Sequence, residues 1–452
     1  MPRTVAVEDL QIGMFIRLDL SWLKHPFPLS RFRIASAEQI AIIRGLGLKE
    51  LTWYPEKSDQ AEQRAPARTG SADASPPSPP SATNGTDAQP APAAGAATAA
   101  AEPPAQQPGA QAAAARRARL VAERAALQHS QALYDEAAQV LQQTSALVTS
   151  DPTAAAQQAQ ALAAALLDKM LVQGELCVRL ISCAASERVA AHALNVSVIA
   201  LLMGRTLGLS QDELLDLGTG ALLHDVGKLD LPPRVHFPED SFGSVELKAY
   251  RDHVALGVAR GRQMALAPGA LAVLAQHHEM ADGSGFPERL ALDAITPAAR
   301  LVALVNRYDN LCNPGPRGVP LTPHEAVSVL FAQNRGRFDM PILNGFIRMM
   351  GIYPPGSVVQ LTDERYALVM QVNASRPLKP RVLVHDAAVP RDEALLLDLE
   401  LEADLGIRRS LAPSKLPSAA AIYLAPQTRV GYYFDLVAEA QAAEQPELAE
   451  NA

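Results

Sequence analysis

Two short runs decide how this chain is interpreted: His224-Asp225-Val226-Gly227-Lys228, and the run HHEMADGSGFP from His277 to Pro287. Further outward, single histidines stand at His192 and His253, and together these positions use five of the ten histidines in the chain. Neutral imidazole and carboxylate groups are ligands for divalent metals such as Fe, Mn, Zn or Ni, and ligands on separate helices can hold two metals inside a bundle. The pattern therefore indicates a metal centre assembled from distant segments.

Each motif also has a purely structural interpretation. A single His-Asp pair recurs by chance, and a lone histidine is more often a core or surface residue than a ligand. His277-His278 would suit the end of a helix, and Asp282 to Gly285 would then be an ordinary exit turn. Only the complete, ordered series outweighs these structural interpretations.

The hydrophobic pattern divides the chain into four parts. Residues 1–57 mix β-branched and aromatic residues with turn formers and one helix-like run, which predicts a small α/β module. Residues 58–112 have almost no large apolar side chains, so a disordered Ala/Pro-rich linker is expected. Residues 113–352 have helical spacing and are predicted to be all-helical. Residues 353–440 carry short β-type runs, which predict a small β-rich extension to a mainly α protein.

The composition limits the function classes. The formal charge of −8 provides no global basic field, so neither a nucleic-acid polymer nor an anionic membrane is an expected partner. Cys177, Cys183 and Cys312 lack CxxC spacing, which argues against a disulfide framework or a thiolate zinc site. No apolar run approaches the ~20 residues that span a bilayer, and the N-terminus has no secretory pattern. A cytoplasmic location without membrane insertion is expected.

Taken together, the series resembles the HD-GYP family of the wider HD phosphohydrolases, over about residues 115 to 350. Phe286 stands where the family has its name-giving Tyr. At the N-terminus, GMFI from Gly13 and SWLKHPF from Ser21 look like a small regulatory or docking module that precedes many HD-GYP domains. The matching motifs in the helical part are HALNV from His192, HDVGK from His224, His253 with Gly257, HHExxDGxG[YF]P from His277, and Ala299-Arg300.

The resemblance implies a phosphodiesterase that hydrolyses the bacterial second messenger cyclic di-GMP to linear pGpG and/or GMP with two divalent metals, iron or manganese. Two metals can deprotonate a water and neutralise charge on the phosphoryl oxygens of an anionic diester. Asp225 is then able to bridge the metals, Lys228 approaches a substrate phosphate, and His224, Asp225 and Lys228 are catalytic. The implied metal ligands are His192, His224, Asp225, His253, His277 and His278, and the implied substrate-binding residues are Lys228, Asp282, Gly285, Phe286, Pro287 and Arg300.

Two positions depart from the family pattern. Asn306 stands where the family has an Asp ligand, so this seventh ligand position offers only a neutral amide oxygen. Asp309 follows one helical turn later and could partly substitute if the helix shifts. Arg188 stands where members with three metals have a Glu, so a binuclear centre is the better expectation.

Two alternatives stay open, and the departures favour the first of them. The chain could be a degenerate member that binds cyclic di-GMP or a partner protein without efficient hydrolysis. It could also be an HD phosphohydrolase for another nucleotide, although the DGSGFP run argues against this. Signalling partners of the N-terminal module and a homodimer also stay open at this stage.

Overall fold

The computed structural model describes residues 3–18, 20, 31–34, 36–58, 108–170, 176–183, 188–239, 241–333, 335–373, 376 and 378–436. The chain divides into two compact units, a smaller one from the N-terminal region and a larger one that contains residues 119–452. Nearly all of the expected linker, the SWLKHPF run and the tail after residue 436 lie outside the described residues.

The N-terminal unit contains an antiparallel sheet of strand order β1-β4-β2-β3 and one helix. Helix α1 begins after Ser36, whose side chain accepts a hydrogen bond from the backbone N–H of Gln39 and so caps the first turn. The predicted α/β module is therefore confirmed. Its elements are β1 (Arg3–Ala6), β2 (Phe15–Arg17), β3 (Arg31–Arg33), α1 (Ala37–Gly45) and β4 (Glu50–Trp53).

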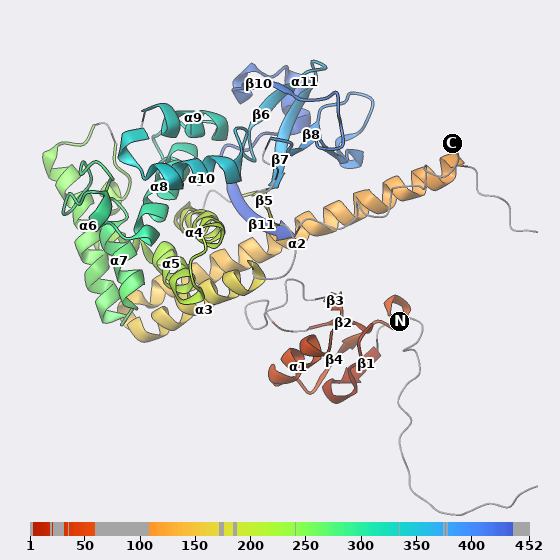
Figure 1. Ribbon diagram of the computed structural model, residues 1–452, viewed down its shortest axis with the longest axis horizontal. Helices are drawn as coiled ribbons and strands as arrows, with labels where there is room; N and C mark the ends of the chain where they lie inside the picture. Colours follow the sequence, from red (N-terminus) through yellow and green to blue (C-terminus); the bar gives the residue numbers. More distant parts are fainter. Residues whose placement is uncertain are drawn as a thin grey trace, which may run out of the picture. The chain divides into compact units, whose positions relative to one another are not determined.

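A bundle of helices forms the larger part of the second unit (Figure 1). Local signals set several helix starts: Ser210 and Glu213 form a capping box at α5, and Thr296 caps α8 with Pro297 in its first turn. The predicted mainly helical class is confirmed. The helices are α2 (Pro108–Ser150), α3 (Pro152–Met170), α4 (Arg188–Thr206), α5 (Gln211–Leu223), α6 (Ser244–Gln263), α7 (Pro268–Gln276), α8 (Pro297–Cys312), α9 (Pro323–Gln333) and α10 (Met340–Met350).

Helix α4 is the centre of this bundle and packs against α5, α8 and strand β11. Fourteen of its 19 residues are buried, because apolar side chains occupy all of its faces. Among the described helices it is the one with the length and hydropathy of a membrane span, but 78% of its apolar window is buried inside the protein, which is typical of a core helix.

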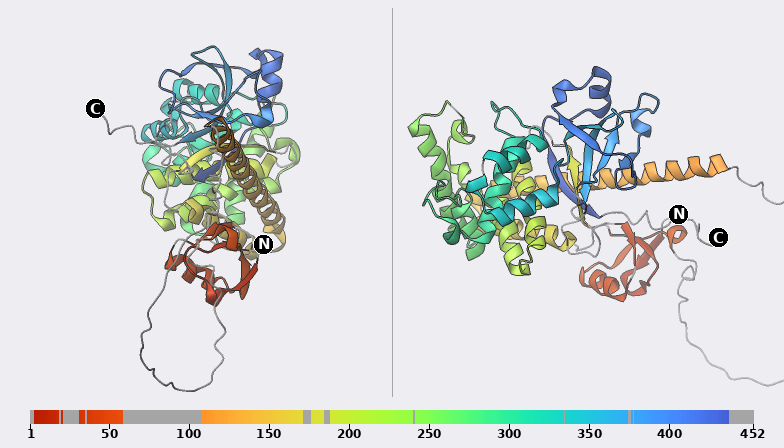
Figure 2. Two further views of the ribbon diagram at one scale, coloured as in Figure 1. Left: turned by 90° about the vertical axis from the view of Figure 1, so that its right-hand side faces the viewer. Right: turned by 45° about the horizontal axis from the view of Figure 1, so that its top comes forward.

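A sheet of seven strands lies beside the bundle, in the order β10-β6-β7-β5-β11, with β8 on β7 and β9 on β8 (Figures 1 and 2). This confirms that the C-terminal part is β-rich. The strands are β5 (Leu176–Ile181), β6 (Val358–Leu361), β7 (Tyr366–Asn373), β8 (Arg381–Val384), β9 (Leu396–Asp398), β10 (Ile407–Leu411) and β11 (Gly431–Leu436), and the short helix α11 spans Ser418–Leu424.

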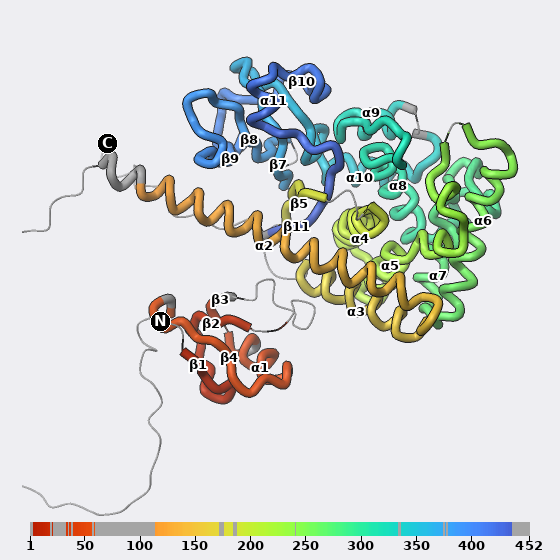
Figure 3. The backbone as a smooth tube through the Cα atoms, turned by 180° about the vertical axis from the view of Figure 1, so that it is seen from behind, coloured from red at the N-terminus to blue at the C-terminus, as the bar shows by residue number. Residues whose placement is uncertain are grey.

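Strand β5 corrects the expectation that residues 113–352 are all-helical. All six of its residues are buried, and it pairs antiparallel with both β7 and β11. The run from Leu176 to Ile181 is apolar except for Arg179, and a run this short cannot be distinguished from part of a buried helix by periodicity alone, which explains the error. Figure 3 shows β5 and β11 side by side near α4, so the β-rich region continues into the helical part of the chain.

Candidate metal centre

Four separate elements bring the predicted ligands together. His192 lies within α4, His224 and Asp225 follow α5, His253 lies within α6, and His277-His278 follow α7. Gly227 allows the segment after α5 to approach α6, because a Cβ at this position would overlap the backbone of His253 and Gly257. The glycines of HDVGK and of His253-x-x-x-Gly257 therefore serve the same contact, and they bring His253 next to Asp225.

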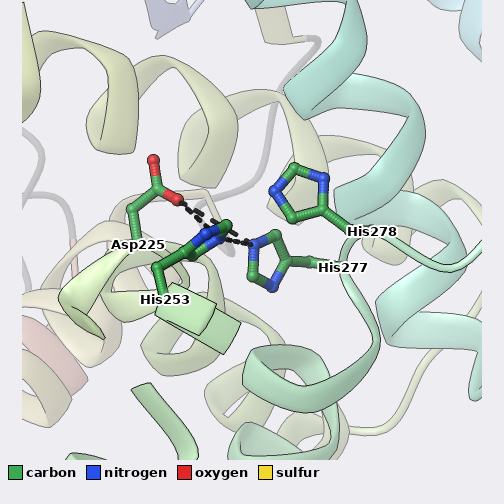
Figure 4. Close-up of side chains that lie close together, drawn as sticks. All are labelled: Asp225, His253, His277 and His278. Carbon is green, nitrogen blue, oxygen red and sulfur yellow. Dashed lines mark hydrogen bonds and ion pairs between the residues drawn. The ribbon is translucent and has the colours of Figure 1, made fainter. Parts of the chain in front are cut away.

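The two carboxylate oxygens of Asp225 face different histidines. Oδ2 lies 3.5 Å from Nε2 of His224 and 3.8 Å from Nε2 of His192. Oδ1 lies 3.5 Å from Nε2 of His253 and 3.9 Å from Nε2 of His277 (Figure 4). Asp225 therefore stands between two groups of imidazoles, one on each oxygen.

The imidazoles are oriented by hydrogen bonds behind them. The Nδ1 atoms of His224, His253 and His277 each bond the backbone carbonyl three residues earlier, at 2.7, 2.5 and 3.0 Å. A ring that donates from Nδ1 presents the lone pair of Nε2 forward, as is usual for metal-ligating histidines. In the first group, Nε2 of His192 and of His224 are 3.2 Å apart, and the same distance separates Nε2 of His253 and His277 in the second. Two nitrogens bound about 2.1 Å from one metal lie roughly 3.0–3.4 Å apart, so both pairs fit a shared ion.

The charge states also suit metal binding. Burial lowers the pKa of His224 to about 4, and burial with neighbouring histidines lowers the pKa values of His277 and His278 well below their usual value. At neutral pH these rings are therefore neutral. Burial alone would raise the pKa of Asp225, but Lys228 and the histidines hold it well below its usual value, so Asp225 is a carboxylate.

One unsatisfied atom supports the fit to a metal. Oδ1 of Asp225 is buried and accepts no hydrogen bond from the described residues. A buried carboxylate oxygen without a donor is costly, and a cation bound there would satisfy it. Ligand atoms within 4.8 Å of one another form two groups that share Asp225: His192, His224 and Asp225 in the first, and Asp225, His253, His277 and His278 in the second.

Lys228 contacts one oxygen of the Asp225 carboxylate, which both groups share. Its Nζ donates to Oδ2 of Asp225 at 2.6 Å, and it lies 5.5 Å from the ring centre of Tyr250 and 5.8 Å from that of Phe237. Tyr250 itself lies with its hydroxyl 3.3 Å from Nε2 of His278. Lys228 and Tyr250 therefore border the two groups of candidate ligands.

The loop after His278 lines the second group. The ring of Phe286 stacks on His278, with centres 4.5 Å apart. Buried Glu279 holds the loop by accepting hydrogen bonds from the backbone N–H groups of Glu288 and Leu290 at 2.7 and 2.9 Å. Asp282 is exposed, and its carboxylate accepts a hydrogen bond from the backbone N–H of Ser284, which shapes the turn. Pro287 is also exposed.

Gly285→Ala is expected to distort this loop. An added Cβ would lie 2.5 Å from three backbone atoms, the Cα of Glu279, the carbonyl oxygen of His278 and the N of Met280. Overpacking of this kind costs about 1–3 kcal/mol, which thermal unfolding of the full chain would measure. Gly345→Ala is the matched control, because its Cβ would meet nothing within 4 Å. Unfolding of Gly285→Ala at the wild-type temperature would contradict this account.

The structure places Asp309 behind His192. Its Oδ2 accepts from Nδ1 of His192 at 2.6 Å, and its Oδ1 accepts from Asn195 and Asn313 at 2.8 and 2.9 Å. Asp309 therefore lies behind the ring of His192, and its partial substitution at position 306 after a shift of the helix stays a prediction. Asn306 is buried, and its Oδ1 accepts from Nδ2 of Asn310 at 2.5 Å.

The two remaining arginines noted in the sequence have other partners. Arg300 pairs with Asp339 at 3.0 Å and donates to the carbonyl of Ile295, so its described contacts tie α8 to the N-terminus of α10. Arg188 donates to the carbonyl of Pro314 at 2.5 Å and lies over the ring of Phe237. No described contact joins either side chain to the two metal groups, and the role of Arg300 in substrate binding stays a prediction.

Sequence reasoning missed the side chains that support the ligands. Asn195, Asn313, Tyr250 and Glu279 are all buried and polar. Two of them carried a signal: Asn195 lies in the HALNV run one helical turn after His192, and Glu279 is the glutamate of the HHExxDGxG[YF]P run.

The HD domain family matches residues 175–342, and the Domain of unknown function (DUF3391) matches residues 3–159. The curated relatives include a cyclic di-GMP phosphodiesterase of Pseudomonas aeruginosa, 29% identical over 200 residues, which are 44% of this chain and 48% of that protein. The cyclic di-GMP phosphodiesterase response regulator RpfG of Xanthomonas campestris is 31% identical over 157 residues, 34% of this chain and 41% of that protein. The chain thus spans less than half the length of these two relatives.

Among solved structures, an HDG"Y"P protein from Bdellovibrio bacteriovorus aligns with a TM-score of 0.39 at 14% identity, over 76% of this chain and 98% of that one. The family match, the curated relatives and the ordered motifs agree on the central region. The match to the HD domain family covers residues 175–342, and the motifs in this region resemble those of the HD-GYP type.

Proposed function

We propose that this chain is a metal-dependent phosphodiesterase that hydrolyses cyclic di-GMP to linear pGpG and/or GMP. The observation that carries the proposal is the pair of imidazole groups that share Asp225, each oxygen of which faces one group. A single carboxylate between two sets of neutral nitrogen ligands is the arrangement expected for a binuclear centre.

In this proposal His192, His224 and Asp225 hold one divalent ion, and Asp225, His253, His277 and His278 hold a second, iron or manganese in each case. Such ions supply a deprotonated water at neutral pH and neutralise charge on the phosphoryl oxygens. Asn306 adds at most a neutral amide oxygen, and that oxygen already accepts a hydrogen bond from Asn310. The centre would therefore hold its metals with one carboxylate fewer than the family pattern provides.

The protein side chains would bind and orient the dinucleotide. Lys228 is positioned to pair with a phosphate, because its ammonium group already lies at Asp225 beside both metal groups. Phe286 offers an apolar ring over His278, and the guanidinium of Arg251 lies 5.2 Å from the centre of that ring. We assign substrate contacts to Lys228, Asp282, Gly285, Phe286, Pro287 and Arg300, of which Arg300 would first have to leave Asp339.

The relatives support the substrate class. Those of Pseudomonas and Xanthomonas are named cyclic di-GMP phosphodiesterases, and one of Vibrio cholerae, 29% identical over 161 residues, is named a 3'3'-cGAMP-specific phosphodiesterase. Both substrates are cyclic dinucleotides with two phosphodiesters. We place the reaction in the cytoplasm, in agreement with three free cysteines among the described residues. A partner protein of the N-terminal module and a homodimer stay predictions.

Turnover tests the proposal directly. The full chain would be purified, its metal content measured, and cyclic di-GMP incubated with it in the presence of Mn²⁺ or Fe²⁺, with products separated by chromatography and 3'3'-cGAMP run in parallel. We expect metal-dependent release of pGpG or GMP from cyclic di-GMP. A folded, metal-loaded protein that binds cyclic di-GMP without cleaving it would overturn the proposal in favour of a degenerate binding module.

A further inference from the structure

A chain of buried hydrogen bonds runs from the C-terminal sheet to one of the imidazole groups. It starts at residues 430–432, at the beginning of β11. The carbonyl of Val430 accepts from the amides of both Asn195 and Asn313, at 3.0 and 2.8 Å. The same two amides donate to Oδ1 of Asp309, and Oδ2 of Asp309 accepts a hydrogen bond from Nδ1 of His192.

The two asparagines are also held from the opposite side. The N–H of Tyr432 donates to Oδ1 of Asn195, and the N–H of Val430 donates to Oδ1 of Asn313, both at 2.9 Å. Each amide is therefore fixed in orientation, with its oxygen toward the backbone of β11 and its nitrogen toward Asp309. Asn195, Asn313 and Asp309 are all buried, so water does not compete for these bonds and each lost partner leaves a costly orphan.

The hydrogen bonds reach one metal group and not the other. His192 belongs to the group with His224 and Asp225, whereas the rings of His253 and His277 are oriented by backbone carbonyls of α6 and α7. A carboxylate that bonds the rear nitrogen of a ligating histidine fixes the ring and raises its basicity. Val430 lies 117 residues after Asn313 and 235 after Asn195, so this support comes from outside the HD motifs.

We propose that the backbone of residues 430–432 positions the ligand His192 through Asn195, Asn313 and Asp309. The C-terminal sheet would then support the group of His192, His224 and Asp225 from behind. The inference rests on the proposed metal-dependent function. Asn195 and Asn313 are positioning residues, since neither touches a metal group directly. Their loss selectively weakens the metal held by His192.

The test titrates Mn²⁺ into metal-free full chain and measures the two dissociation constants, with unfolding temperature recorded in parallel. Asn313→Ala is expected to weaken the first site by about tenfold or more, the usual effect of losing a partner behind a ligand, and to leave the second unchanged. Arg179→Gln is the matched control: it removes the 2.9 Å ion pair between β5 and Asp435 of β11 but changes none of the groups between Val430 and His192. It should lower stability and keep both metal affinities.

A double substitution tests the route. If the effect passes through Asp309, adding Asn313→Ala to Asp309→Ala should cause no further loss of affinity, because the intermediate group is already gone. The inference would be overturned if folded Asn313→Ala kept the Mn²⁺ affinity of both sites, or if the substitution weakened both affinities equally. Wild-type chain that binds two Mn²⁺ without cleaving cyclic di-GMP would instead refute the proposed activity while leaving the positioning role measurable.

Discussion

Asp225→Asn is expected to remove both metal retention and hydrolysis. The change keeps the volume of the side chain but takes the single negative charge from between the two imidazole groups, and it replaces one carboxylate oxygen by an NH₂ that faces their nitrogens. We expect metal content of the purified protein to fall below one ion per chain and turnover to fall by at least ~100-fold, since both metals share this ligand.

Asp230→Asn provides the control for this experiment. Asp230 lies five residues further along the same segment, but its carboxylate pairs with Arg260 at 2.6 Å on the exposed side. Its amide variant should retain metal and activity. Undiminished turnover in folded Asp225→Asn, measured by chromatography of the nucleotides, would show that the shared carboxylate is not part of the chemistry.

Asp309→Ala is expected to weaken metal binding by the same factor in the native chain and in the Asn306→Asp variant. The structure bonds Asp309 to Nδ1 of His192, so its removal frees the ring behind the metal and should cost roughly 10–100-fold in affinity. In the Asn306→Asp background the added carboxylate should raise affinity, because Nδ2 of Asn310 can donate to it as it now donates to the amide oxygen. The loss caused by Asp309→Ala should nevertheless be equal in both.

This outcome separates two roles for Asp309. If Asp309 served as the missing ligand, its removal would be severe in the native chain and mild once Asn306→Asp supplied a carboxylate. Metal titration of the four proteins decides between them. A loss confined to the native chain would contradict the position behind His192 described above.

Local sequence was sufficient for the chemistry of the ligands. His224-Asp225 and His277-His278 could be selected only as parts of the complete ordered series, since each pair alone also has a structural interpretation, and that series carried the family resemblance. The helical class also followed from periodicity, which depends on neighbours three and four residues apart. The glycine of HDVGK was noted as part of a motif, but its reason, the approach to His253 and Gly257, became visible only in three dimensions.

What the sequence by itself determined is therefore the set of candidate ligands, the mainly helical class and the small modules at both ends. Only the tertiary structure decided that β5 joins the C-terminal sheet, that Asp309 stands behind His192, and that Val430 holds the two asparagines. These contacts join residues more than 100 positions apart, between backbone groups and side chains that have no distinctive local pattern. Periodicity and motif spacing report only near neighbours along the chain, so the supports behind the metal ligands emerge from packing alone.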